Sequence, residues 1–233
     1  LNQILNICVE SGVIPFSIHA RCGFIALQIL ESLLDQKIIS KNDYDNFLKN
    51  IPTISSEFSL DLNDFLNKKI TKKIFIKRFG HLRPSTYDIS SKNYENLISE
   101  SFFNKHSSNI NASKSKLTIA KKIWQKNNIK ILKKLKSENF DVNQLELFNF
   151  LTKSIQGREK GKYEFTKCIN KSFEIIIIIS KKINIPVSEL QFLPIEVFLN
   201  FENNNFININ NIKKNINFSK KKHYLTSLVK LPS

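Results

Sequence analysis

The segment 145–179, LELFNFLTKSIQGREKGKYEFTKCINKSFEIIIII, decides the fold of this chain. From Leu145 to Ile155 the apolar residues recur every three or four positions, which is the spacing of one face of an α-helix. The five isoleucines at 175–179 would favour a strand by propensity alone. The helical period flanks them, and no second strand-like segment offers a pairing partner. We therefore expect one long helix that continues through the isoleucines.

The same helical spacing recurs along most of the chain and predicts an all-α fold with little or no sheet. After Pro15, a long helix is expected because apolar residues line one face as far as Leu33. Ser40 or Asn42 would cap the next helix, and Ser90 and Ser91 would cap a later one. Shorter helices are expected around residues 44–48, 58–66, 70–79, 94–97 and 123–135. The Asn-rich segment 203–217 leaves helix and strand both open.

The chain is expected to form two helical lobes. Between His106 and Lys116 it consists mainly of Ser, Asn and Lys and has little to bury, which is typical of a mobile connection. We therefore predict a first lobe at residues 1–104, a connection at 105–117 and a second, lysine-rich lobe at 118–233.

The composition is strongly basic. The 233 residues include 36 Lys or Arg and 20 Asp or Glu, a formal net charge of +16. Residues 1–66 carry a net charge of −4 and residues 67–233 a net charge of +20. Such an excess is typical of proteins that bind nucleic acid or anionic membranes. Nearly all basic residues are lysines, however, and the abundance of Lys, Asn and Ile fits the amino-acid bias of an AT-rich genome. We therefore do not expect nucleic acid as the partner.

Arginine is used at four positions only: Arg21, Arg78, Arg83 and Arg158. A guanidinium group presents a planar fork of donors that pairs with carboxylate or phosphate in a way that lysine cannot imitate. Two interpretations stand: structural ion pairs within the protein, such as Arg83 with Asp88, or contact with an external anion. One hypothesis is that Arg83 and Arg158 approach each other across the two lobes and form an anionic docking surface.

Several classes of site are not expected. Cys8, Cys22 and Cys168 are widely spaced, without a Cys-x-x-Cys pair, which argues against a disulfide framework or a thiolate zinc site and fits a reducing cytoplasm. His19 with Cys22 is a weak metal pattern that lacks further ligands. No P-loop is present. No apolar run approaches the roughly 20 residues that cross a bilayer, so no membrane contact is expected.

The segment Gly80–Ile89, GHLRPSTYDI, has the most distinctive composition in the chain. Gly80 follows the periodic run 70–79 as a helix C-cap does. Pro84 disfavours a helical conformation at Arg83, so an ordered, extended loop is expected. This loop would display Arg83, Tyr87 and Asp88 in a fixed arrangement.

The loop resembles the segment G-H-L-R-P-G-T-Y-D-I of proteins similar to phosphoenolpyruvate synthase and pyruvate phosphate dikinase, where it lies between the ATP-grasp domain and the swivelling phosphohistidine domain. Ser85 stands where that pattern usually has Gly and would carry a steric cost if the position needs a positive φ. Further similar segments are Pro15–Phe16 with Ala20–Arg21 and Phe24–Ala26, Gly157–Glu159 with Lys162, Phe165 and Thr166, then Ser188–Leu190 with Phe192–Leu193, and Leu228–Pro232.

The resemblance implies a fragment of an ATP-dependent dikinase-type phosphotransferase, acting as the helical spacer between its nucleotide-binding and phosphohistidine domains. Those flanking domains would be its partners, and ATP and Mg²⁺ would belong to the parent enzyme. We expect no catalytic residue, no metal and no cofactor in this fragment, which alone would be inactive. The alternative is a basic helical module that binds nucleic acid or another protein.

The candidate residues for docking or anion contact come from these motifs. His81 lacks the glycine-rich Thr/Ser-His context of the family's carrier histidine, so two roles remain open for it: fixing the loop by packing, or contacting a phosphate or the docked carrier domain. The full candidate set is Arg21, His81, Arg83, Tyr87, Asp88, Arg158 and Glu159.

Overall fold

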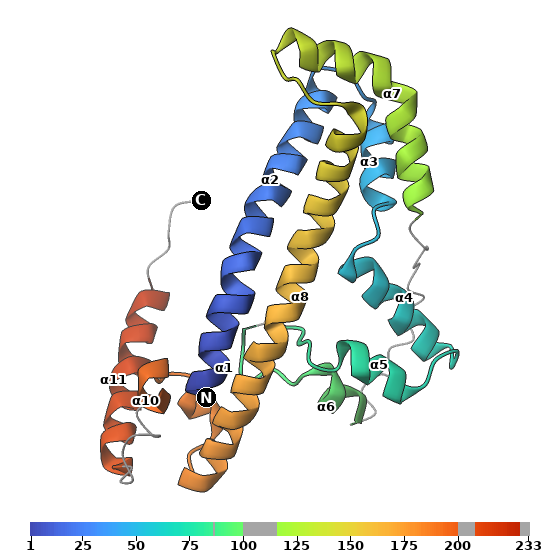
Figure 1. Ribbon diagram of the computed structural model, residues 1–233. Helices are drawn as coiled ribbons and strands as arrows, with labels where there is room; N and C mark the ends of the chain where they lie inside the picture. Colours follow the sequence, from blue (N-terminus) through green and yellow to red (C-terminus); the bar gives the residue numbers. More distant parts are fainter. Residues whose placement is uncertain (86, 100–115, 200–207, 229–233) are drawn as a thin grey trace.

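The computed structural model describes residues 1–85, 87–99, 116–199 and 208–228. Every regular element in these ranges is a helix, which confirms the predicted all-α fold. The two long helices α2 (Ile14–Asp35) and α8 (Gln144–Ile183) lie side by side and antiparallel, and the other helices pack around them (Figure 1).

The remaining elements are short by comparison, apart from α7 and α11. They are α1 (Asn2–Ile7), the π-helical η1 (Cys8–Val13), α3 (Lys41–Lys49), α4 (Ile54–Leu66), α5 (Lys72–Phe79), α6 (Tyr94–Ser99), α7 (Leu117–Ser137), α9 (Val187–Leu190), α10 (Ile195–Leu199) and α11 (Ile209–Ser227).

The predicted long helix is present as α8, which has 40 residues and is about 60 Å long at 1.5 Å per residue. It begins at Asn143, whose side chain accepts a hydrogen bond from the Glu146 amide at 2.9 Å. It ends at Asn184, which adopts a left-handed conformation with φ 54°. The five isoleucines lie inside the helix, as expected, because residues on both sides of them keep one helical face buried.

Three hydrophobic clusters lie along α8. The first, near its start, combines buried residues of α2, α3 and α7 with Ile39 and Ile51, which flank α3. The second surrounds its end with α9, α10 and α11, and the third joins α4, α5 and α6. The first cluster therefore draws on both predicted lobes. The predicted connection 105–117 lies outside the described residues except for 116 and 117, so the lobe boundaries stay a prediction.

Glycine allows the N-terminal helices to approach α8 closely. A Cβ atom at Gly12 would lie 2.7 Å from the Phe165 Cβ, and one at Gly157 would lie 2.9 Å from the His19 Nδ1. Both distances are shorter than van der Waals contact. Gly23 and Gly161 also face the opposite helix across this interface. A chain with five glycines thus places four of them where α2 and η1 meet α8.

The helix boundaries correct some details of the sequence-based expectations. Of the two proposed caps of α3, Ser40 is the one used, accepting from the Asp43 amide at 3.0 Å. The cap of α6 is Asn93, which accepts from the Asn96 amide at 3.0 Å, so the prediction of Ser90 and Ser91 is wrong.

The structure also answers two questions that the sequence left open, one in the loop and one in the Asn-rich segment. Gly80 ends α5 as predicted, and Ser85 does not adopt a positive φ, so it carries no such steric cost. The Asn-rich segment is helical from Ile209 onward, while 203–207 lie outside the described residues.

One helical run is more apolar than the sequence reading expected. Residues Asn2–Asp35 include an 18-residue window with a mean hydropathy of 1.5, which is long and apolar enough to cross a membrane by length and composition. A mostly buried core helix of a soluble protein and a signal sequence pass the same test; α8 packs along this run, but only 17% of the window is buried. The absence of membrane contact therefore stays a prediction.

Candidate functional site

Arg83 anchors the loop Gly80–Ile89 to α8. Its side chain is 9% exposed. Its Nη2 donates to the Asn170 Oδ1 at 3.1 Å, and its Nη1 donates to the Ser91 carbonyl. The guanidinium also lies over the Phe173 ring, 5.1 Å from the centroid. Burial lowers the pKa of Arg83 from its ordinary value, against the opposing effect of nearby carboxylates. This arginine therefore serves the packing of the loop on α8.

Asn170 is the centre of this buried contact. Its Oδ1 accepts from both Arg83 and the Asn93 Nδ2, the latter at 3.2 Å. Its Nδ2 donates to the Glu174 Oε1 at 2.8 Å. The amide thus links the guanidinium to a carboxylate by hydrogen bonds. Hydrogen bonding is the usual condition for keeping a buried charge in a protein interior; here it covers Nη1 and Nη2, while the Arg83 Nε has no hydrogen-bond partner among the described residues.

Asp88 does not form the ion pair with Arg83 that was one of the two interpretations. Its Oδ1 accepts from the Ser90 amide at 2.8 Å and from the Ser90 hydroxyl at 2.6 Å. These two hydrogen bonds lower the pKa of Asp88. Tyr87 is 60% exposed beside the Lys162 ammonium, which lies 5.8 Å from its ring centroid.

His81 packs against α8. Its Nε2 lies 3.3 Å from the Tyr163 carbonyl oxygen, and the two rings meet edge to face with centroids 4.9 Å apart. Burial lowers the pKa of His81, and the hydrogen bond to Tyr163 opposes that effect only in part. Of the two roles left open by the sequence, these contacts favour packing.

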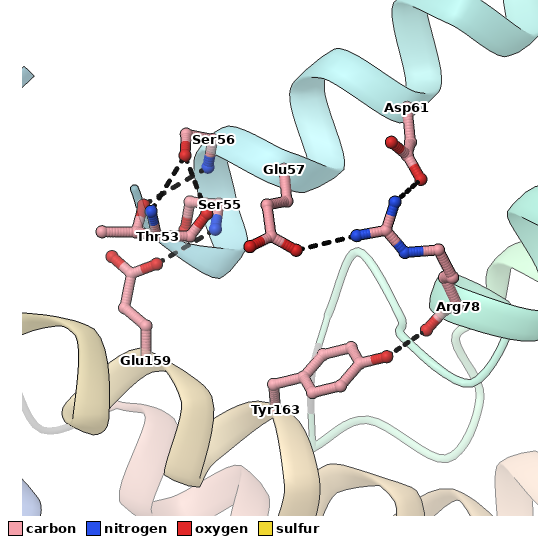
Figure 2. A network of polar contacts seen from close by, with 8 residues as sticks. All are labelled: Thr53, Ser55, Ser56, Glu57, Asp61, Arg78, Glu159 and Tyr163. Atoms are coloured by element: carbon pink, nitrogen blue, oxygen red, sulfur yellow. Dashed lines mark hydrogen bonds and ion pairs between the residues drawn. The ribbon is translucent and has the colours of Figure 1, made fainter. Parts of the chain in front are cut away.

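Arg78 and Tyr163, which were not among the candidates, tie α4, α5 and α8 together (Figure 2). The Arg78 Nη2 donates to the Glu57 Oε2 at 2.7 Å, and its Nη1 donates to Asp61. The Tyr163 hydroxyl donates to the Arg78 carbonyl. One signal was present in the sequence: Glu57 and Asp61 are four residues apart, which places both carboxylates on one face of a helix.

Glu159, a predicted site residue, contacts the N-terminus of α4 (Figure 2). Its Oε2 accepts a hydrogen bond from the Ser55 amide at 3.0 Å. The same helix start carries a capping box formed by Thr53 and Ser56. A carboxylate at this end also interacts favourably with the helix dipole. Glu159 therefore fixes α4 against α8.

Replacing Glu159 with alanine should lower the free energy of unfolding by about 1 kcal/mol, because the first turn of α4 loses a charged acceptor. Glu164→Ala is the matched control, since this exposed carboxylate on the same helix forms its ion pair with Lys167 one turn away and makes no hydrogen bond to α4 among the described residues. Urea denaturation of the purified chain compares them. Equal midpoints for the two variants would contradict the assigned role of Glu159.

A pocket of about 360 Å³ opens between the loop, α4 and α8. Its floor is mainly apolar, while Lys162 and Glu159 of α8 bring opposite charges to it. The lining residues are Ile54, Ser55, Phe58, Ser59, Leu82, Arg83, Pro84, Tyr94, Glu159, Lys162, Tyr163 and Thr166. The pocket thus joins two motifs that are far apart in the sequence. In the described part of the chain, no three His, Cys, Asp or Glu residues cluster as metal ligands would.

Arg158 faces α2 and takes no part in this pocket. Its guanidinium lies 5.3 Å from the Phe24 ring centroid, and its aliphatic part packs where Gly23 leaves room. Arg83 contacts α8 at Asn170, which is about 18 Å farther along the helix at 1.5 Å per residue. Arg158 therefore lies between α8 and α2, and Arg83 lies between the loop and a later part of α8. The two arginines do not approach each other.

Arg21 lies exposed on α2, within an apolar surface that we call the α2 outer face. Ile14, Ile18 and Ile25 flank it at spacings of three and four residues, so that all four side chains share one side of the helix. The three isoleucines are 54%, 58% and 52% exposed. Apolar side chains this exposed and this regularly spaced are typical of an interaction surface.

No protein-family model, no curated protein and no solved structure matches this chain.

Proposed function

We propose that this chain is the helical spacer of an ATP-dependent dikinase-type phosphotransferase, similar to phosphoenolpyruvate synthase, between the nucleotide-binding and phosphohistidine domains. One observation carries the proposal: two segments that resemble this family, far apart in the sequence, both contact a third such segment around the middle of α8. The Phe16 ring lies tilted against that of Phe165 with centroids 5.1 Å apart, and His81 packs on Tyr163. Segments that serve a common role would be expected to meet in this way.

The form of the molecule suits a spacer. The helix α8 is about 60 Å long and is held along its length by the close approach of α2 and by three hydrophobic clusters. Phosphoryl transfer depends mostly on positioning and on stabilising charge, so a rigid element contributes by fixing distances. ATP and Mg²⁺ would then be held by the flanking domains.

The α2 outer face supplies a docking surface for one of these domains. Interfaces between protein domains combine an apolar centre with arginine and few other charges. Ile14, Ile18 and Ile25 around Arg21 match that composition. Docking here would leave the loop pocket open on the other side of α8.

The test uses the full-length polypeptide that carries this chain. Incubated with labelled ATP, it should acquire acid-labile label, which is the property of phosphohistidine, while the chain 1–233 alone should not hydrolyse ATP. The double variant Ile18→Asp, Ile25→Asp should reduce the rate of labelling by about tenfold or more, because charge at the centre of an interface opposes docking. The control Ile129→Asp changes an isoleucine on α7 that is 83% exposed and should label normally. Absence of label in the full-length protein, or ATP hydrolysis by the chain alone, would refute the proposal.

The competing function is nucleic-acid binding, and the lysine-rich helix α7 would be the binding surface. This helix contains lysine at 121, 122, 126, 130, 133, 134 and 136 and has no acidic residue. Filter binding at about 50 mM and about 200 mM salt separates the two functions, because a protein that contacts six or more phosphates loses roughly 10³-fold or more in affinity over that range. We expect only weak retention at either concentration. Tight binding with such a steep salt dependence would favour the nucleic-acid module instead.

A further inference from the structure

Two of the three cysteines meet where the N-terminal helical run packs against α8. Cys8 opens the π-helical η1 and is 5% exposed. Its Sγ lies 3.9 Å from the Phe165 carbonyl oxygen of α8. Cys168 follows Phe165 by three residues, which places it on the same side of α8. The third cysteine, Cys22, lies farther along α2.

The two backbones are unusually close at this point. Gly12 follows Cys8 by about one helical turn, and a Cβ atom there would lie 2.7 Å from the Phe165 Cβ. Packed helices are normally about 8–10 Å apart at their axes, and side chains on both partners set that spacing. A disulfide needs Cα atoms about 4.4–6.8 Å apart. Close packing of the kind seen at Gly12 is the condition that lets cysteines on facing helices approach this range.

We propose that Cys8 and Cys168 form a reversible disulfide that fastens the N-terminal helical run to α8 when the protein meets a peroxide. Cys168 is partly exposed and reacts first: its sulfur is oxidised to a sulfenic acid, and hydrogen peroxide is reduced to one water. The Cys8 thiol then attacks that sulfur, forming the S–S bond and releasing the second water. A thiol reductant reverses the bond by exchange.

The environment of Cys8 suits the second of these steps. Burial, and then the neighbouring Cys168, raise the pKa of the Cys8 thiol. A thiol that is rarely ionised and almost fully buried is a poor first target for a dissolved oxidant. It lies against the turn of α8 that carries Cys168, so it can react once that residue has been oxidised.

The disulfide would hold the start of the N-terminal run while leaving the loop pocket open. The bond joins positions that are separated by most of the chain, so it restricts the unfolded state strongly. We expect the thermal midpoint to rise on oxidation by on the order of 10 °C.

The test treats the folded chain with hydrogen peroxide and counts the thiols that react after denaturation. The wild type has three cysteines and none is bonded in the structure, so the count should fall to one. Mass spectrometry without reductant should link the peptides that contain Cys8 and Cys168. Dithiothreitol should restore both the thiols and the original midpoint.

Three serine variants decide which thiols are involved. Cys8→Ser and Cys168→Ser should each prevent the cross-link and the rise in midpoint, while Cys22→Ser should retain both. A wild-type count that stays at three would overturn the proposal, as would a cross-link that includes Cys22 or joins two chains. The wild-type result is sufficient by itself if a variant fails to fold.

Discussion

Arg83→Ala should lower the free energy of unfolding by about 3 kcal/mol, because it removes two hydrogen bonds from a charged donor and one cation–π contact. The Ser91 carbonyl would lose its guanidinium partner, and Asn170 would keep only Asn93 as a donor to its Oδ1. Arg83→Lys should recover only part of the loss, since an ammonium group cannot reproduce the planar fork. Urea denaturation followed by circular dichroism measures each value.

The control for this prediction is Arg21→Ala. It removes the same chemical group from an exposed position on α2, so its effect should stay within about 0.5 kcal/mol. If both variants unfolded at the same denaturant concentration, the buried contact of Arg83 with α8 would contribute nothing to stability. The loop would then have to be held by its other contacts, such as that of His81 with Tyr163.

A second prediction concerns the close approach of η1 to α8. Gly12→Ala should destabilise the chain by about 2 kcal/mol, because the new methyl group would force the two backbones apart. Gly161→Ala is the matched control, since a Cβ there would lie 3.5 Å from the nearest atoms of Phe16, an ordinary contact. That substitution should stabilise the protein by about 0.5–1 kcal/mol, because it removes a glycine from the interior of a helix.

Opposite signs for the two alanine variants are therefore the expected result of thermal or urea unfolding. Stabilisation by both would mean that the helices can separate at no cost, and destabilisation by both would mean that Gly161 also lies in a contact too tight for a methyl group. During treatment of the reduced protein with peroxide, Gly12→Ala should also slow formation of the Cys8–Cys168 bond, which links this prediction to the proposed redox chemistry.

The helices could be predicted from the sequence because their apolar spacing is a local property. Segment 145–179 illustrates this: a three-to-four-residue period on both sides outweighed the strand preference of its isoleucines. Caps were harder to assign. Ser40 was one of two caps proposed for α3, and Asn93 was missed in favour of Ser90 and Ser91, since Ser and Asn both accept hydrogen bonds at a helix start.

The candidate site was predictable only in part. The composition of Gly80–Ile89 indicated an ordered loop, yet nothing local showed that Arg83 would turn inward to Asn170. The pairing of Arg78 with Glu57 and Asp61, and the contact of Cys8 with Phe165, join segments distant in the chain. Such contacts depend on how helices cross, which residue spacing does not encode.

The position of α8 has a consequence for how the protein loses its structure. One helix contributes buried residues to two of the hydrophobic clusters, and the partly buried Tyr163 at its middle packs against the third. Fraying of that helix at any point would expose apolar surface in the cluster beside it. The described regions should therefore melt as one cooperative unit, with amide protection along α8 that is nearly uniform from Leu147 to Ile183.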